Sequence, residues 1–268
     1  MKVYNSETNN IFFAGDIHGE FQTINVSINQ YNLSDCAIVF CGDIGIGFEK
    51  EEYYIQTFNK LTKVLKKKNI HLYMFRGNHD SKDFFNGEHF NDFKYIHILP
   101  DYSVILCPTK AILCVGGATS IDRTYRLQCM ERNAADYMRW HDCGWDEAYK
   151  NCKKFYWNNE AVVYDENELN QLDELGILID TVCTHTAPSF CKPVTKIGIE
   201  GWLSLDENLS EDLDNERKSC ELIYDYLKSH NHPLENWYYG HFHFHNTEII
   251  DNVKFTLLDM SREKLDLI

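Results

Sequence analysis

Five short polar motifs recur along this chain of 268 residues, and most of them directly follow an apolar run. The motifs are GDIHG at 15–19, GDIG at 42–45, RGNHD at 76–80, THTAP at 184–188 and GHFH at 240–243. An apolar run that ends in such a motif predicts a buried strand leading into a loop. Binding sites in open α/β sheets form where strands end, so we expect these motifs to contribute to one site.

The order of the elements between the motifs favours an α/β fold. Residues 11–14 and 37–41 are predicted as buried strands and residues 20–31 as a helix, which together form a parallel βαβ unit. Closely spaced apolar segments between 95 and 117, separated by prolines, indicate a meander or a second sheet. Helices are also predicted at 51–68 and 217–229, and strands at 71–75, 177–184, 237–239 and, after a turn at 251–252, at 255–258.

Two segments depart from this alternation. Residues 120–159 are rich in Arg, Trp, Tyr and Met and are predicted as a helical insertion. This insertion either packs its aromatic side chains on the sheet edge or covers the site as a substrate cap. Residues 192–215 contain glycine and then many acidic residues, which predicts a solvated loop. Since the chain has no internal repeat and no clear linker, we expect residues 1–268 to form a single domain.

Charge and cysteine content narrow the classes of function. The chain has 41 acidic and 26 basic residues, a net charge of −15, which disfavours an extended nucleic-acid surface. No stretch approaches the length of a membrane span, and the first residues lack a secretory apolar region. The ten cysteines form no CxxC pair, so we expect reduced thiols in a cytoplasmic protein.

The first two motifs carry carboxylates and an imidazole suited to divalent metals. Asp16 and His18 are separated by one residue just past a strand end, so both side chains can point to one ion. Asp43 follows the neighbouring parallel strand, about 5 Å away. A carboxylate can bridge two ions, whereas an imidazole ordinarily cannot. Asp43 is therefore the natural bridging ligand.

The remaining motifs add one amide and several imidazoles. Asn78 and His79 are neighbours and point differently, so one is expected to ligate a metal while the other faces substrate. His185 ends an apolar strand. His241 and His243 share one face if their segment is extended. Together with the first two motifs, these side chains are sufficient for two ions.

The series of motifs resembles the calcineurin-like metallophosphoesterase superfamily over residues 15–243. The resemblance implies a four-layer α/β/β/α sandwich with a helical insertion. The segment GGATSIDRTYR at 116–126 is similar to one in small bacterial members. One departure is the sequence GDIGIGF, in which Gly45 replaces an Asp and no Asp-Arg-Gly follows. This departure disfavours a protein serine/threonine phosphatase.

The resemblance also implies roles for individual residues. The first ion would be bound by Asp16, His18, Asp43 and His243, and the second by Asp43, Asn78, His185 and His241. His79 would face the leaving group as a general acid, oriented by Asp80. The two ions would be divalent, with manganese expected first and iron, zinc or nickel as alternatives.

Three arginines are candidates for contact with a substrate phosphate. Arg76 directly precedes GNHD, although a structural salt bridge is the role that its position favours. Arg123 and Arg126 belong to the segment that resembles small bacterial members. Their alternative role is to pair with nearby acidic residues on the surface.

The function expected from these residues is phosphoester hydrolysis, with a phosphomonoester of unknown identity as the first substrate class. A hydroxide bridging the two ions would attack in line with the leaving group. The nearest alternative is a phosphodiesterase or nuclease that uses the same site. A non-catalytic metal-binding scaffold is a further alternative, which the complete set of ligand positions disfavours.

Overall fold

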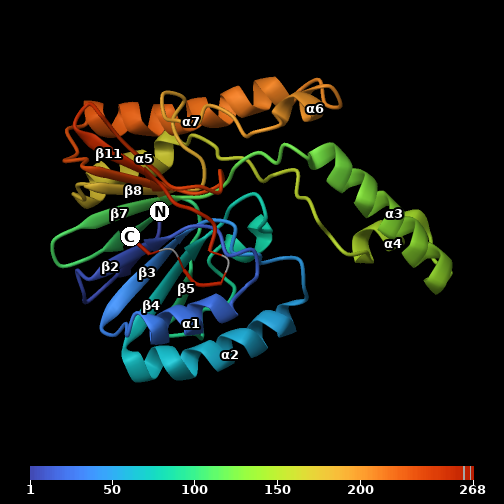
Figure 1. The fold of residues 1–268 in the computed structure, drawn as a ribbon, viewed down its shortest axis with the longest axis horizontal. Helices are drawn as coiled ribbons and strands as arrows, with labels where there is room; N and C mark the ends of the chain where they lie inside the picture. Colours follow the sequence, from blue (N-terminus) through green and yellow to red (C-terminus); the bar gives the residue numbers. More distant parts are fainter. Residues whose placement is uncertain (262, 266) are drawn as a thin grey trace.

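Two β-sheets pack face to face, and helices cover the outer surface of each (Figure 1). The computed structural model describes residues 1–261, 263–265 and 267–268. Within these residues the smaller sheet has the strand order β2-β3-β4-β5 and the larger sheet the order β1-β6-β7-β8-β9-β11-β10. The predicted four-layer α/β/β/α sandwich is therefore confirmed.

The smaller sheet is entirely parallel, as the βαβ pattern predicts. Its strands are β2 (Ile11–Ala14), β3 (Cys36–Cys41), β4 (Ile70–Phe75) and β5 (Ile96–Ile98). Its outer face is covered by α1 (Gln22–Gln30) and α2 (Glu51–Lys68). Tyr54, Phe58 and Leu61 of α2 are buried against this face. Acidic residues begin α2 and lysines end it, which complements the helix dipole.

The larger sheet is mixed. Its strands are β1 (Val3–Asn5), β6 (Ser103–Leu106), β7 (Ala111–Val115), β8 (Thr181–Thr184), β9 (Asn236–Tyr239), β10 (Asn246–Ile250) and β11 (Val253–Leu257). The order β7-β8-β9 is parallel, while β6–β7 and β10–β11 are antiparallel pairs. The outer face is covered by α5 (Glu166–Leu175) and α7 (Leu209–Ser229). The predicted hairpin turn at 251–252 joins β10 to β11.

Alternating side chains of the strands separate the apolar interior into layers. In β3, Ile38 and Phe40 face the helices of the small sheet, whereas Val39 and Cys41 face the second sheet. Between the sheets they meet residues of the large sheet such as Ile112. A third cluster lies between the large sheet and its helices. Strand β5, which the sequence analysis grouped with the following strands in a meander or second sheet, instead pairs in parallel with β4 in the small sheet.

The insertion at 120–159 contains α3 (Arg123–His141) and α4 (Trp145–Asn151). These helices form an antiparallel pair that projects from the body at the right of Figure 1. Ala134, Ala148 and Cys152 form a small apolar cluster between them. Trp140, near the tip, is 84% exposed. Tyr137 and Tyr149 pack against this cluster, whereas Trp145 is exposed like Trp140. We call this projecting pair the arm (residues 123–151).

The expectation of a solvated loop at 192–215 is wrong in part. This region contains α6 (Ile199–Leu203) and the beginning of α7. Glu211 and Asp212 lie in the first turn of α7, where acidic side chains interact favourably with the helix dipole. The acidic run therefore starts a helix. The only other helical turn outside the labelled α-helices of the described residues is a short 3-10 helix at Lys82–Phe85.

Across the described part of the chain, none of the helices combines the length and the apolar character that crossing a membrane requires.

Candidate metal centre

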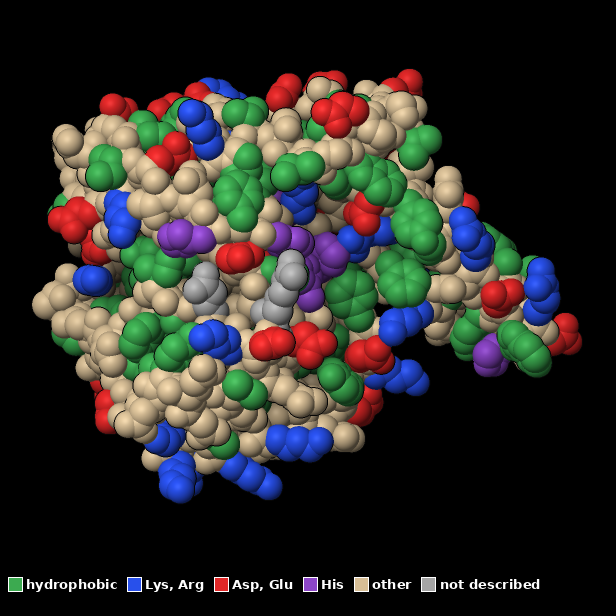
Figure 2. Space-filling model, in the orientation of Figure 1, with side chains coloured by type: hydrophobic (Ala, Val, Ile, Leu, Met, Phe, Trp, Pro, Cys, Tyr) green, Lys and Arg blue, Asp and Glu red, His purple; other side chains and the backbone are tan. Residues whose placement is uncertain are grey.

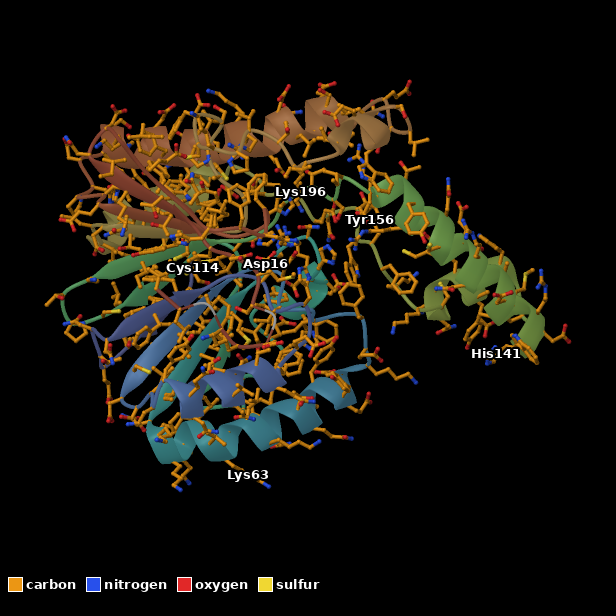
Figure 3. All side chains as sticks on the ribbon, viewed as in Figure 1. Asp16, Lys63, Cys114, His141, Tyr156 and Lys196 are labelled. Carbon is orange, nitrogen blue, oxygen red and sulfur yellow. The ribbon has the colours of Figure 1, made fainter. Side chains whose placement is uncertain are left out.

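The five motifs meet where strands of both sheets end. Asp16 follows β2, Asp43 follows β3, and Asn78 follows β4, so the small sheet supplies three of the side chains. His185 follows β8 and His241 follows β9, so the large sheet supplies the others. Figure 3 shows Asp16 between the two halves of the molecule, near the base of the arm. Histidines gather in the corresponding region of Figure 2.

One group of side chains could hold a metal ion. Asp16, His18, Asp43 and His243 each offer one ligand atom, and these atoms all lie within 4.8 Å of one another. His243 Nε2 is 3.0 Å from Asp16 Oδ2 and 3.3 Å from His18 Nε2. Both carboxylates are buried, whereas the side chains of His18 and His243 are 24% and 37% exposed. Solvent therefore reaches this group through its histidines.

A second group lies on the other side of Asp43. Asn78 Oδ1 is 2.9 Å from His241 Nδ1 and 3.2 Å from His185 Nε2. His185 Nε2 is also 3.2 Å from Asp43 Oδ1. All four side chains are buried. Asp43 therefore adjoins both groups, as a bridging ligand must.

The donor atoms of both groups fit a metal. Asp16 Oδ2 and Asp43 Oδ2 are buried, and neither accepts a hydrogen bond from the described residues. Both oxygens instead face imidazole nitrogens, with His243 Nε2 3.0 Å from Asp16 Oδ2 and His18 Nδ1 3.9 Å from Asp43 Oδ2. Buried carboxylate oxygens are unfavourable without a hydrogen bond or a cation. His185 Nδ1 donates to the carbonyl oxygen of Cys41 at 2.7 Å, which leaves its Nε2 available.

The charges within the second group also favour binding of a cation. Burial by itself would lower the pKa of His185, but the charges of Asp43 and Asp16 raise it to about 9. Burial would raise the pKa of Asp43, yet His185, His79 and His18 bring it well below its usual value. A proton therefore occupies the His185–Asp43 pair near neutral pH, and a bound cation would take its place.

The backbone is shaped to bring these side chains together. Asp43, His241 and His243 have φ values of 50°, 71° and 60°, a region that non-glycine residues rarely adopt. A Cβ atom at Gly77 would overlap Asp43 Oδ1, so only glycine allows this close approach. The segment at 240–243 is therefore a bend, and the expectation that it is extended is wrong.

Comparison with known proteins identifies the family. The profile of the calcineurin-like phosphoesterases matches residues 10–259. The chain belongs to this family. Its members are metal-dependent hydrolases, in agreement with the resemblance of the motifs.

Two solved structures show the same fold. TT1561 of Thermus thermophilus is 12% identical with a TM-score of 0.52, and the match covers 96% of this chain and 97% of that chain. A dimetal phosphatase from Danio rerio is 12% identical with a TM-score of 0.50, and the match covers 95% of this chain and 90% of that chain. No curated protein sequence matches the chain. At this identity the two structures support the fold alone.

In this phosphoesterase, His79 lies beside the candidate metal ligands and contacts a cation from the arm. Arg126 Nη2 is 2.9 Å from His79 Nε2, and Nη1 is 3.4 Å from Nδ1. The His79 ring is 4.8 Å from that of His18, centroid to centroid. Burial lowers the pKa of His79 to about 4, with Asp43 opposing this effect and Arg126 adding to it.

Asp80 has a different place from the one expected. Its carboxylate accepts backbone N–H bonds from four residues: Ile44, Gly45, Ile46 and Gly77. Among the described residues, no hydrogen bond joins it to the His79 side chain, so the expectation that Asp80 orients His79 needs correction. Asp80 instead holds the loop that follows Asp43 against the loop that carries Asn78.

Two of the three candidate arginines are engaged elsewhere. Arg76 is fully buried, and its guanidinium donates to Asp101 and to backbone carbonyls, including those of Glu160 and Ala161. Arg123 pairs with Asp206 and Asp212. Both contacts correct the interpretation of Arg76 and Arg123 as phosphate ligands, because the guanidinium donors are already used.

Sequence reasoning missed a buried chain of hydrogen bonds behind Asn78. Asn78 Nδ2 donates to Ser120 Oγ at 2.9 Å, and Ser120 Oγ donates to Glu160 Oε2 at 2.8 Å. The Ser120 backbone N–H donates to Glu160 Oε1. These bonds turn Asn78 Oδ1 toward His185 and His241. Ser120 lies in the segment GGATSIDRTYR, but no local motif marks Glu160, which is 40 residues away in the sequence.

Proposed function

We propose that this chain is a phosphomonoesterase that uses two divalent ions. The proposed ligands of the first ion are Asp16, His18, Asp43 and His243, and those of the second are Asp43, Asn78, His185 and His241. The buried carboxylate oxygens that face imidazoles without a hydrogen bond, and the amide oxygen that faces two imidazoles, support this assignment. Two ions in these positions would supply an activated water and would offset charge on the transferred phosphoryl group.

The observation that favours a monoester is the contact of Arg126 with His79. A guanidinium beside the ligand groups can donate two parallel hydrogen bonds to phosphate oxygens. A phosphomonoester dianion has more charge and more free oxygens than a diester, so it gains more from such a cation. Arg126 is also held by Asp122 at 2.6 Å, which fixes the guanidinium near His79.

His79 is proposed to protonate the departing oxygen once the substrate phosphate has drawn Arg126 away from His79 Nε2, which the guanidinium contacts in the substrate-free protein. In the substrate-free protein the low pKa of His79 favours a neutral ring at pH 7, with burial as the main cause. A phosphate dianion bound to Arg126 would offset the arginine charge and raise the pKa of His79. Substrate binding would thereby favour the protonated ring that a general acid requires.

The proposal treats residues 1–268 as one catalytic unit in which residues 120–159 contribute to substrate binding. The rings of Phe48 and Trp157 are in edge contact, with their centroids 5.3 Å apart. The centroid of the Phe48 ring lies 6.2 Å from that of His79. The base of the insertion thus lines the proposed substrate site. Manganese is the first metal to test, since the donors combine oxygen and imidazole nitrogen. Ten free thiols accord with the proposed cytoplasmic setting.

The test compares p-nitrophenyl phosphate with bis-p-nitrophenyl phosphate. Metal-stripped protein is reloaded with manganese, and kcat/KM is measured for both compounds, with Asp43→Asn as the inactive control. We expect the monoester to be preferred and the variant to lose activity. Preference for the diester would overturn the monoesterase proposal. Activity that survives in Asp43→Asn would show that the turnover arises elsewhere or from a contaminant.

One observation favours a diesterase as the second candidate. The arm projects away from the two sheets in Figure 1. A diester has substituents on both sides of its phosphate and needs an open site. If neither compound is hydrolysed by protein that holds two ions per chain, the phosphoesterase proposal is replaced by a metal-binding scaffold.

A further inference from the structure

Lys196 lies beside the candidate metal centre but has no partner there. It belongs to the loop between β8 and α6 and lines one small pocket with His241. Among the described residues it forms no hydrogen bond and no ion pair within 4.0 Å. In Figure 3 it lies above Asp16, in the half of the molecule that contains the large sheet.

The loop around Lys196 exposes its apolar side chains and partly buries its lysine, which is the reverse of the usual pattern. Val194 is 66% exposed and Ile197 is 98% exposed, whereas Lys196 between them is partly buried. Lysine is among the residues least often buried without a partner. A loop that exposes two apolar side chains and turns its lysine inward suggests that the ammonium group has a ligand to meet.

The charges around Lys196 place its ammonium at the site. Burial lowers the pKa of Lys196, while Asp43 and Asp16 raise it. Burial is the main cause that lowers the pKa of His79 and of His241, and the charge of Lys196 adds to both effects. Lys196 therefore acts on residues of both proposed ligand groups. The charge of Lys196 affects these groups even though no carboxylate of the described residues forms an ion pair with it.

The loop before Lys196 is held in place. Arg217 donates to the carbonyl oxygens of Pro188, Cys191 and Pro193. Just after Lys196, Ile199 is 7% exposed at the start of α6. Both sides of the segment are thus fixed to the body, which limits the positions open to the lysine.

An acidic protein needs local cations to hold an anionic substrate. The net charge of this chain is −15, and the proposed ligands include two buried aspartates. Arg126 supplies one cation from the arm. Lys196 supplies a second from the large-sheet side, and Figure 2 shows Lys or Arg side chains bordering the histidine cluster at two positions. Lysine is cationic at neutral pH and can donate up to three hydrogen bonds.

We propose that Lys196 binds a non-bridging oxygen of the substrate phosphate and, with Arg126, selects the dianionic phosphate of a monoester. This inference rests on the proposed phosphoesterase function and assigns a residue that the motifs do not contain. A charge-assisted hydrogen bond to phosphate would make binding about 10- to 100-fold tighter. A diester, which has one charge fewer, would depend less on this lysine.

The test uses the full-length, manganese-loaded protein and the variants Lys196→Gln and Lys196→Arg. Lys192→Gln is the matched control, since Lys192 is exposed on the same loop and its recorded hydrogen bonds use only backbone atoms. Binding of inorganic phosphate is measured by calorimetry, metal content by mass spectrometry, and kcat/KM with p-nitrophenyl phosphate and its bis ester.

We expect Lys196→Gln to keep two ions per chain and to bind phosphate about 10- to 100-fold more weakly. Its kcat/KM should fall more for the monoester than for the diester. Lys196→Arg should recover part of the loss, and Lys192→Gln should match the wild type. Unchanged phosphate binding in Lys196→Gln would overturn the inference, and so would loss of metal, which would indicate a structural role.

The same measurements separate this inference from the proposed function. If the wild type hydrolyses the monoester and Lys196→Gln is identical to it in binding and rate, only the role of Lys196 fails. If the wild type binds phosphate through Lys196 but hydrolyses neither compound, the phosphate site stands and the proposed esterase activity fails.

Discussion

Arg126 Nη2 lies 2.9 Å from His79 Nε2, although 47 residues separate the two side chains in the sequence. His79 belongs to the loop after β4, and Arg126 belongs to the first turns of α3. The contact joins the arm to the candidate metal centre. The arm is therefore part of the proposed site, and removal of the arm should weaken substrate binding more than metal binding.

We predict that Arg126→Ala lowers kcat/KM for p-nitrophenyl phosphate by about 10- to 100-fold, because a charged hydrogen-bond donor to phosphate is lost. Arg123→Ala on the same helix is the matched control. Its guanidinium is bound by Asp206 and Asp212, so kcat/KM should change little. The free energy of unfolding should instead fall by about 1–2 kcal/mol. Equal kinetic losses in both variants would contradict the assignment.

The shared position of Asp43 predicts a difference between two aspartate variants. Asp43→Ala should weaken binding of both ions, whereas Asp16→Ala should weaken only one, because Asp16 adjoins a single ligand group. Activity should fall by at least about 10³-fold in Asp43→Ala. Metal content measured at limiting free manganese checks this, with the exposed Asp225→Ala as control. Two tightly bound ions in Asp43→Ala would rule out a bridging role.

Ser120 should act on metal binding through Asn78. Removing the Ser120 hydroxyl frees the Asn78 amide to rotate. Ser120→Ala should therefore weaken the binding of one of the two ions by about 10- to 100-fold. The other ion should bind as in the wild type. Stepwise manganese titration resolves the two affinities, and Ser229→Ala, on the surface of α7, provides the control. A uniform change in both affinities would point to general destabilisation.

A histidine pair away from the site predicts a loss of stability in acid. His97 Nε2 is 3.1 Å from His71 Nδ1, and the His97 ring stacks on Tyr73. Burial, with a smaller effect of the charge on His71, lowers the pKa of His97 from 6.5 to about 4. The folded state therefore binds fewer protons than the unfolded state between these values, so the contribution is complete above pH 6.5 and is lost toward pH 4.

The loss should amount to at most about 3 kcal/mol in the free energy of unfolding. His97→Phe keeps an aromatic ring against Tyr73 but removes the titrating group. Urea unfolding at pH 7 and pH 4.5 should show a smaller acid-induced loss in this variant than in the wild type. The exposed His141→Phe should behave like the wild type. Parallel losses in all three proteins would assign the acid sensitivity to other groups.

The sequence determined the parts of this protein that depend on local pattern. Apolar runs ended by Gly-Asp predicted the strand ends correctly at β2 and β3, and helical periodicity predicted α2 at its observed bounds. The family followed from short motifs whose residue types suit metal binding. Such signals are local because strand and helix periods, and the tight turns that glycine permits, need only neighbouring residues.

Only the tertiary structure decided which polar side chains are free to meet a substrate. Arg76 and Arg126 are both arginines near metal-binding motifs, yet Arg76 is occupied by Asp101 and by carbonyls 83 to 85 residues away. Lys196 gave no sequence signal, because its environment combines its own loop, α6, α7 and the loops that follow β7 and β9. The physical reason is that the availability of a charge depends on its partners, and those partners are brought close by packing between distant segments of the chain.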